Sequence, residues 1–177
     1  MTRVFLDATT LISLGTIGEL DLLTNLTGTL VVLPVVQDEV TTEPARTNLA
    51  RFIERNDLHT DDPEIHDRIH QAKDVLGAST ETGDVHLIAG VIAHTDDDRP
   101  IGVVSDDRRI RTVSRGLGGT VTGTIGVIVR AVDEGLAPQD ARAVLDRVDA
   151  HGLHMTGSLR AKADSLIDDA ADTAASQ

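Results

Sequence analysis

Acidic side chains follow two short apolar runs of this sequence, at the point where each run ends. Residues 3–6 (RVFL) lead into Asp7, and residues 101–104 (IGVV) lead one residue later into Asp106 and Asp107. Such runs are typical of strands buried on both faces of a parallel sheet. Because ligands bind beyond the carboxyl ends of the strands in open parallel sheets, these carboxylates mark a candidate site. The competing interpretation is structural, since Asp is also common in turns and at helix N-caps.

Two further acids lie near the starts of predicted helices. Glu39 falls within a helix expected to begin at Pro34, and Asp84 falls in the first turn of a helix opened by Thr80 or Thr82. The residues after Asp84 are apolar nearly all round that helix, which indicates a buried helix. Both acids also have structural interpretations, because glutamates are common on exposed helix faces and a carboxylate near a helix N-terminus is stabilised by the helix dipole.

The pattern of acids predicts a metal site. If the strands that carry Asp7 and the Asp106–Asp107 pair are neighbours, their carboxylates converge on one crevice. Two carboxylates 4 Å apart repel each other by about 4 kcal/mol at an effective dielectric constant of 20, so such a cluster persists only when a proton or a cation neutralises it. The chain has no cysteine, and ligands that are all oxygen atoms favour Mg²⁺ or Mn²⁺.

The overall charge decides how the many acids are interpreted. The formal net charge is -13, and Lys73 and Lys162 are the only lysines in the sequence. This lysine-poor, Asp-rich composition resembles proteins of halophiles such as halophilic archaea, in which high salt screens the repulsion between surface acids. Functional acids therefore have to be selected by position. A strongly acidic surface also repels nucleic acid, which argues against general affinity for it.

Strand-like and helix-like segments alternate along the chain. This alternation predicts an α/β fold with a central parallel sheet of four to five strands, helices on both faces and right-handed crossovers. The expected strands are residues 3–6, 30–33, 101–104 and 118–122, with 58–60 as a fifth candidate. The expected helices are residues 11–26, 34–42, 44–56, 63–76, 80–94, 108–115 and 124–135, followed by a C-terminal helical hairpin of 138–151 and 159–171.

The length suggests one domain with a sizeable core. We expect residues 1–135 to form the unit that carries the acids and residues 136–177 to form a helical extension packed on it. The sequence shows neither a signal peptide nor an apolar run long enough to span a bilayer, which predicts a cytoplasmic protein without a membrane partner.

The acids and their surroundings resemble a PIN domain, the metal-dependent nuclease fold of VapC-type toxins and related ribonucleases. The matching segments are VFLDATTLISL with Asp7, VVQDEV with Glu39, TGDVHLIAG with Asp84, and VVSDDRRIRTVSR with Asp106 and Asp107. The later segment GLGGTVTGTIGVIVRAVDEG, with the helices after it, resembles a mostly uncharacterised prokaryotic branch of PIN-like proteins. The resemblance extends over nearly the whole chain and implies a three-layer PIN-like fold.

The resemblance also implies an activity. Asp7, Glu39, Asp84 and either Asp106 or Asp107 would hold one or two Mg²⁺ or Mn²⁺ ions and hydrolyse RNA phosphodiester bonds. The last acid of the family often follows Thr or Ser by two positions, which selects Asp107, whereas the geometry of the strand exit could equally present Asp106. Both residues therefore stay candidates.

Side chains next to the acids extend the predicted site. Three hydroxyl groups could orient carboxylates or water from outside the metal; they belong to Thr9, Thr10 and Ser105. The densest positive patch of the sequence follows the last acids and either binds phosphate or pairs with surface acids; it consists of Arg108, Arg109, Arg111 and Arg115. Three of these arginines share one helix face at three- and four-residue spacing.

The resemblance implies partners as well. Many PIN toxins pair with a small antitoxin and form homodimers, so an RNA substrate, a cognate antitoxin and a second copy of the chain are the expected partners. The competing function is non-enzymatic: a PIN-like protein that retains the acids but acts as a nucleic-acid-binding or regulatory interaction module. Thermal stabilisation by Mn²⁺ that disappears in Asp7→Asn separates the two, because a bare binding module would show none.

Overall fold

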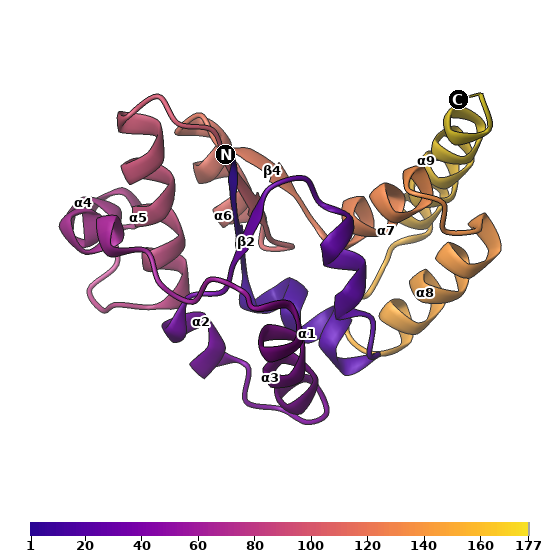
Figure 1. Ribbon diagram of the computed structural model, residues 1–177, viewed down its shortest axis with the longest axis horizontal. Coiled ribbons are helices and arrows are strands. Elements are labelled where there is room, and N and C mark those ends of the chain that lie inside the picture. The colour runs from indigo at the N-terminus through magenta and orange to yellow at the C-terminus, as the bar shows by residue number, and fades with distance from the viewer. Residues whose placement is uncertain (177) are drawn as a thin grey trace.

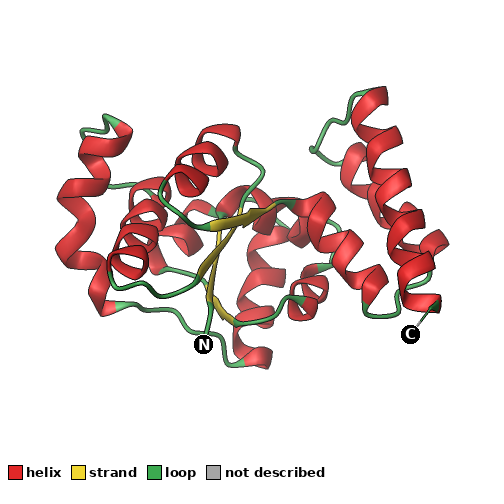
Figure 2. Cartoon of the chain, turned by 90° about the horizontal axis from the view of Figure 1, so that it is seen from above, coloured by secondary structure: helices red, strands yellow, loops and turns green. Residues whose placement is uncertain are grey.

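A parallel sheet lies at the centre of the molecule, with helices on both of its faces (Figure 1, Figure 2). The computed structural model describes residues 1–176. The sheet has the order β2-β1-β3-β4, and each neighbouring pair is parallel. Its strands are β1 (Arg3–Leu6), β2 (Thr29–Val31), β3 (Ile101–Val104) and β4 (Thr120–Thr122). The predicted α/β fold with a parallel sheet flanked by helices is confirmed.

The strands that precede the candidate acids are neighbours. The register pairs Arg3 with Ile101 and Leu6 with Val104, so β1 and β3 end at the same level. Beyond this ladder the main-chain N–H of Asp7 donates a hydrogen bond to the carbonyl oxygen of Val104 at 2.9 Å. Both strands are almost wholly buried, as expected for apolar strands covered on two faces. The adjacency on which the predicted site depends is therefore present.

Helices connect the strands and form the outer layers. They are α1 (Ala8–Thr16), η1 (Leu20–Asn25), α2 (Pro34–Glu39), α3 (Ala45–Asn56), η2 (Pro63–Arg68), α4 (Ile69–Leu76), α5 (Gly83–Asp96), α6 (Arg108–Gly116), α7 (Thr124–Asp133), α8 (Pro138–Ala150) and α9 (Gly157–Ala175). The segments η1 and η2 are 3₁₀ helices. Figure 2 shows that helices cover the sheet from both sides, as the alternating sequence pattern predicts.

Four segments differ from the expected secondary structure. Residues 63–76, expected as one helix, form the 3₁₀ helix η2 followed by α4. The helix expected over residues 11–26 breaks at Gly18, whose φ of 77° lies in the left-handed region, a conformation that Gly adopts without a steric penalty. The helix expected over residues 34–42 ends at Glu39, ahead of Pro44. The strand expected over residues 58–60 is reduced to a single parallel bridge between Val31 and His59, because an Asp-Asp-Pro sequence follows at once and starts η2.

Helix α5 lies in the core against the sheet. Its middle is buried on every side, which confirms the buried helix expected from its apolar residues. Gly90 allows a close approach to β1, since a Cβ atom at this position would lie 3.1 Å from the ring of Phe5. The first turn of α5 carries Asp84, and Asp7 directly follows β1, two residues after Phe5. This contact therefore helps to set the distance between two of the candidate acids.

The C-terminal helices form the predicted hairpin beside α7. Helix α9 packs against α7 and α8 and buries Ala163, Ile167 and Ala170. In Figure 1 the three helices lie together at one end of the molecule, away from α4 and α5. The division into a unit of residues 1–135 and an extension of residues 136–177 stays a prediction, and its last residue, Gln177, lies outside the described residues.

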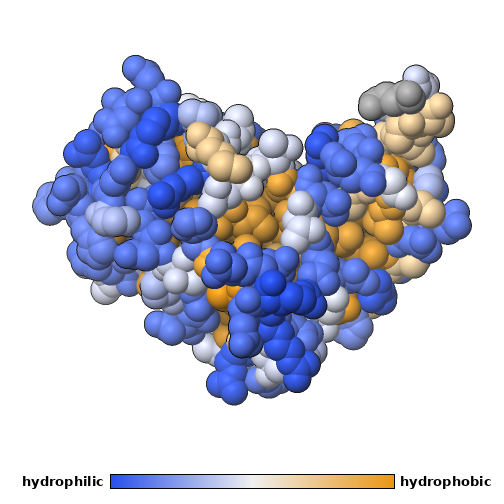
Figure 3. Space-filling view, in the orientation of Figure 1, coloured by the Kyte–Doolittle hydropathy of each residue, from blue (hydrophilic) through white to orange (hydrophobic). Residues whose placement is uncertain are grey.

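The face of the molecule seen in Figure 3 is mainly hydrophilic, in keeping with the charge of the sequence. Figure 3 shows hydrophilic side chains over most of one face, with apolar ones gathered in its hollowed middle and over the C-terminal helices. Among the helices of residues 1–176, none combines the length and the apolar character needed to cross a membrane.

Candidate metal centre at the carboxyl end of the sheet

Asp7 is buried at the exit of β1, with 2% of its surface exposed. It occupies the N-cap position of α1, but its side chain makes no capping hydrogen bond. Instead its Oδ2 atom accepts hydrogen bonds from Thr9 Oγ1 at 2.7 Å and Ser105 Oγ at 2.6 Å. These hydroxyl groups fix the orientation of the carboxylate between β1 and β3. The remaining oxygen, Oδ1, has no hydrogen-bond partner among the described residues, so the N-cap interpretation does not account for this acid.

The adjacent acids at the exit of β3 make different contacts. Asp107 caps α6, because its Oδ1 atom accepts a hydrogen bond from the N–H of Ile110 at 2.9 Å. Asp106 bonds to α7, where its Oδ1 atom accepts from the N–H of Thr124 at 2.8 Å. Its Oδ2 atom accepts from the hydroxyl groups of Thr124 and Thr10. Both oxygens of Asp106 are thus engaged within the protein, whereas Oδ2 of Asp107 has no hydrogen-bond partner in residues 1–176.

Glu39 reaches the same edge of the sheet from the end of α2. Its Oε1 atom accepts a hydrogen bond from the main-chain N–H of Gly83 at 2.6 Å, at the start of α5. The exposed N–H groups and the dipole of a helix N-terminus favour a carboxylate at this position. Only glycine permits this approach, since a Cβ atom at residue 83 would lie 2.4 Å from Glu39 Oε2. The residue is exposed, but its side chain is held by this contact.

The pKa of Asp84 is affected by its burial and by the charges of the other acids. Burial, followed by the nearby negative charges of Asp7, Asp107 and Glu39, raises the pKa of its carboxyl group from 3.8 to about 6. The positive charge of Arg109 acts in the opposite sense. A carboxyl group half-buried among three others is the electrostatic setting expected at a cation site.

The carboxylates of the candidate acids do not form a compact set of ligand atoms. In residues 1–176, the only set of three or more metal-ligating side chains whose ligand atoms all lie within 4.8 Å of one another is elsewhere, at Asp62, Glu64 and His94. The candidate acids at the carboxyl end of the sheet lie farther apart, as expected from the repulsion between their negative charges. Mg²⁺ keeps several of its waters and usually takes only one or two carboxylates directly, so a wider group of oxygen ligands suits it. The donor set and its negative field therefore fit a hydrated divalent cation.

The arginines after Asp107 are not neutralised by surface acids. Among the described residues, none of Arg108, Arg109, Arg111 and Arg115 has a carboxylate oxygen within 4.0 Å, although nine other arginines do. Arg109 donates to the carbonyl oxygen of Leu76 at the end of α4, and Arg111 donates to that of Ser105 at 3.1 Å. Of the two interpretations of this patch, pairing with acids within the protein is not what the structure shows.

A second polar cluster lies beside Arg3, at the amino end of β1. The buried carboxylate of Asp62 accepts hydrogen bonds from His94 at 3.0 Å and from Arg3 at 3.0 Å, both through Oδ2. Its Oδ1 atom accepts from the N–H of Glu64 at the start of η2. Glu64 in turn pairs with Arg99. Because guanidinium groups already neutralise these acids, we interpret the cluster as a structural tie between β1, η2 and α5.

We expect Asp62→Asn to lower the free energy of unfolding by about 2 kcal/mol, the usual contribution of a hydrogen bond to a charged group. The amide retains the shape and the cap of η2 but removes the charge that faces Arg3 and His94. Denaturant unfolding at neutral pH measures the change. Asp61→Asn, at an exposed neighbouring position, serves as the control. Equal stability of both variants and the wild type would contradict this account of the cluster.

Some residues that position the acids are not evident from the sequence. Thr124 and Gly83 hold Asp106 and Glu39, and neither stood out, because each acts on an acid far away in the chain. A hydroxyl residue at the start of a helix and a glycine directly before Asp84 were the available signals. Thr10 and Ser105, which were predicted to orient carboxylates, bond to Asp106 and Asp7 respectively.

Comparison with known families agrees with this geometry. A family model described as a PIN domain (DUF3368) matches residues 3–169. The matched region runs from the start of β1 into α9 and includes all five candidate acids. No curated protein is similar enough to the chain to be matched with it. PIN domains are generally nucleases and usually use divalent metal ions. The chain therefore belongs to the PIN-domain family.

Proposed function

We propose that this protein is an endoribonuclease that hydrolyses RNA phosphodiester bonds with Mg²⁺ or Mn²⁺. The observation that carries the proposal is the convergence of four acids from separate elements on one edge of the sheet. Asp7 follows β1, Glu39 ends α2, Asp84 lies in the first turn of α5, and Asp107 follows β3. The charges of the other three acids contribute, after burial, to raising the pKa of Asp84 to about 6.

Each of three acids keeps one oxygen for a ligand. Within the described part of the chain, Asp7, Glu39 and Asp107 each accept hydrogen bonds through one carboxylate oxygen only. The other oxygens of these residues, with the carboxylate of Asp84, would hold one or two divalent ions. A bound ion supplies a hydroxide nucleophile at neutral pH and neutralises charge on the phosphate and the leaving oxygen.

The surrounding residues prepare this site before an ion or substrate arrives. Thr9 and Ser105 lock the carboxylate of Asp7 in one orientation, and the N–H of Gly83 does the same for Glu39. Arg109, which is held by the carbonyl oxygen of Leu76, reduces the repulsion around Asp84. Preorganised ligands lower the reorganisation needed when a charged group binds.

We assign the last ligand position to Asp107 and a positioning role to Asp106. The hydrogen bonds of Asp106 use both of its oxygens and tie the exit of β3 to the start of α7. Asp107 keeps an oxygen and contributes to the raised pKa of Asp84, to which Asp106 does not contribute among the main causes. The spacing of Asp107 two residues after Ser105 agrees with this assignment.

Substitution of Gly83 by Ala is expected to lower cleavage about 10- to 100-fold without unfolding the protein. The added Cβ atom would lie 2.4 Å from Glu39 Oε2 and 2.9 Å from its Cδ, so the flexible end of Glu39 must move away. A displacement of about 1 Å at a catalytic group can reduce a rate by about 100-fold. Cleavage rates and thermal unfolding measured together test this. Gly77→Ala would be a poor control because of its positive φ; Gly157→Ala, with open space around it, is a suitable one.

The decisive test of the proposed function is cleavage of structured and single-stranded RNAs in molar KCl with Mn²⁺ or Mg²⁺. The wild type should cleave, whereas Asp7→Asn and chelator-treated wild type should not. Thermal stabilisation by Mn²⁺ should also be lost in Asp7→Asn. Metal binding by a folded wild type without any cleavage would favour the competing role as a nucleic-acid-binding or regulatory module.

The biological setting of this activity extends the proposal. We propose a cytoplasmic protein from a halophile such as a halophilic archaeon, because acids outnumber basic residues and lysine is rare. Its activity should then persist or rise in molar KCl. By likeness to VapC-type proteins, it would be the toxin of a pair with a neighbouring antitoxin and would form a homodimer. Growth arrest on induced expression, relieved by the protein encoded next to it, tests the toxin role.

A further inference from the structure

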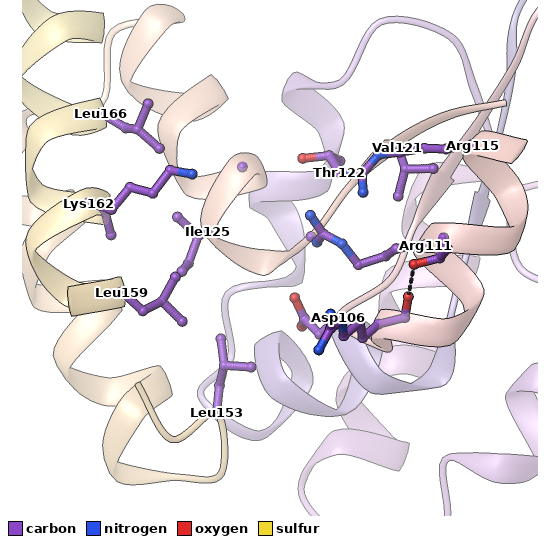
Figure 4. A pocket seen from close by; sticks show the side chains of 15 residues that line it. Asp106, Arg111, Arg115, Val121, Thr122, Ile125, Leu153, Leu159, Lys162 and Leu166 are labelled. Atoms are coloured by element: carbon purple, nitrogen blue, oxygen red, sulfur yellow. Dashed lines mark hydrogen bonds between the residues drawn. The ribbon is translucent and has the colours of Figure 1, made fainter. Parts of the chain in front are cut away.

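A groove with a volume of about 640 Å³ runs beside the candidate metal centre. One wall comes from α6 and the other from α9, and the side chain of Asp106 lines the groove (Figure 4). We call it the α6–α9 groove and define it by Arg108, Arg111 and Arg115 on α6 and by Leu159, Lys162 and Leu166 on α9. Figure 4 shows the side chains of Leu159 and Lys162 facing those of Arg111 and Asp106 across the gap.

The groove collects the cations that the rest of the protein does not neutralise. The sequence has 16 lysines and arginines, and nine of them lie within 4.0 Å of a carboxylate oxygen in the described part of the chain. Of the seven that remain there, four line this groove; they are Arg108, Arg111, Arg115 and Lys162. In a chain with a net charge of -13, such a concentration of unpaired cations matches an anionic ligand with several charges.

The wall formed by α9 is apolar as well as basic. Leu159 and Leu166 are 38% and 37% exposed, which places them among the few large apolar side chains that face solvent in residues 1–176. Leu153 and Ile125 continue this surface along the groove. A ligand that paired only with the cations would leave these side chains exposed to water. The apolar wall therefore favours a ligand that has apolar groups next to its negative charges.

We propose that the α6–α9 groove binds a single-stranded stretch of the nucleic acid next to the bond that is cut. Its phosphates would pair with the four cations, and its bases would lie against Leu153, Leu159 and Leu166. A duplex keeps its bases stacked inside and would leave the leucines unmatched. This inference rests on the proposed nuclease function and adds the form of the substrate and the part of the chain that selects it.

The composition of the protein also determines how the strand is recognised. Proteins that bind single strands commonly stack bases on aromatic side chains. This chain has two phenylalanines and neither Trp nor Tyr, and both Phe5 and Phe52 are buried. Bases in the groove therefore contact leucine side chains and guanidinium planes, which do not read hydrogen-bonding edges. The groove should accept single strands with little preference for sequence.

The role of the four cations in the groove is tested with a short, labelled single-stranded RNA in the presence of chelator. Its binding is measured by fluorescence anisotropy over a KCl titration. Four phosphate contacts predict a slope of log affinity against log salt of about -3, and removal of one cation should make it shallower by about 0.7. Lys162→Ala and Arg115→Ala should show this change. Their controls are Lys73→Ala on α4 and Arg51→Ala on α3, which remove the same charges outside the groove.

The apolar wall is tested with an oligonucleotide that lacks bases but keeps the same phosphates. Leu159→Ala should weaken binding of the ordinary RNA several-fold and leave binding of the abasic strand unchanged. Val75→Ala, at another exposed apolar position, should change neither. A duplex of the same sequence should bind more weakly than the single strand to the wild type.

Several results would overturn the inference. The inference is wrong if the wild type and Lys162→Ala bind the single-stranded RNA with equal affinity, or if the wild type binds the duplex at least as tightly as the single strand. If the groove binds only a labelled acidic peptide, it belongs to a protein partner instead. Because chelator prevents cleavage, these results are independent of the nuclease assay. Groove-dependent binding without metal-dependent cleavage would refute the proposed function alone, and cleavage unaffected by the groove variants would refute the groove alone.

Discussion

Asp107→Asn should reduce RNA cleavage by about 1000-fold, whereas Asp106→Asn, one residue earlier, should reduce it by less than about 10-fold. Loss of a ligand exceeds the 10- to 100-fold effects that are typical of changes around the ligands of a metal. Asparagine is as good an N-cap as aspartate, so the cap of α6 at Ile110 is retained and Asp107→Asn should fold normally. The loss of activity would then reflect the loss of a negatively charged oxygen.

The contrast with Asp106 follows from its hydrogen bonds. An asparagine at this position can still accept from the N–H of Thr124, while its amide donates to the hydroxyl groups of Thr124 and Thr10. Cleavage rates of the two variants under saturating Mn²⁺, together with Mn²⁺ affinities from calorimetry, provide the comparison. If Asp106→Asn were the inactive variant and Asp107→Asn the active one, the assignment of the two roles would have to be exchanged.

Asp84→Asn should lose cleavage by a similar factor and yet make the metal-free protein more stable at neutral pH. The pKa of Asp84 is raised to about 6 in the folded protein, from an ordinary value of 3.8. Between these values the folded state holds a proton that the unfolded state has released, so stability falls as pH rises from about 4 to 6, and the deficit persists above that range. The full shift corresponds to about 3 kcal/mol, which we reduce to about 1 kcal/mol because solvent reaches the half-buried group.

Denaturant unfolding with chelator, at constant salt, tests the expectation. At about pH 7 the variant should be more stable than the wild type by about 1 kcal/mol, and near pH 4 the difference should almost vanish, because Asp84 is then protonated in the folded protein. Mn²⁺ should reverse the order by stabilising the wild type more. His86→Asn, on the same helix, provides a control. An increase in stability that is the same at both pH values would show that the negative charge of Asp84 does not destabilise the folded protein.

The edge of the sheet that carries the acids could be predicted because it depends on local signals. The apolar residues of β1 and β3 identify strands, and parallel strands present whatever follows them at a common edge. The same reasoning left the role of Asp7 open, because a residue between a strand and a helix is also a candidate cap. Only the position of Ser105, which comes from the other strand, decides between the two.

Features that depend on distant parts of the chain could not be predicted. The different roles of Asp106 and Asp107 result from the location of Thr124 at the start of α7. Lys162 reads in the sequence as one more exposed residue of an amphipathic helix, and only the packing of α9 beside α7 brings it opposite α6. The sequence likewise predicted four arginines with a shared role, whereas Arg109 is held by Leu76 and the other three line the groove.

The contact between Gly90 and Phe5 bears on which ion the proposed metal site would bind. Any side chain at residue 90 would force α5 and β1 apart by a few tenths of an ångström; α5 carries Asp84, and β1 leads directly into Asp7. Mg²⁺ binds oxygen at about 2.0–2.1 Å and Ca²⁺ at about 2.3–2.6 Å, a difference of similar size. At the proposed metal site, the absence of a methyl group at residue 90 would therefore limit the separation of Asp7 and Asp84, so that core packing as well as ligand type would influence which cation binds.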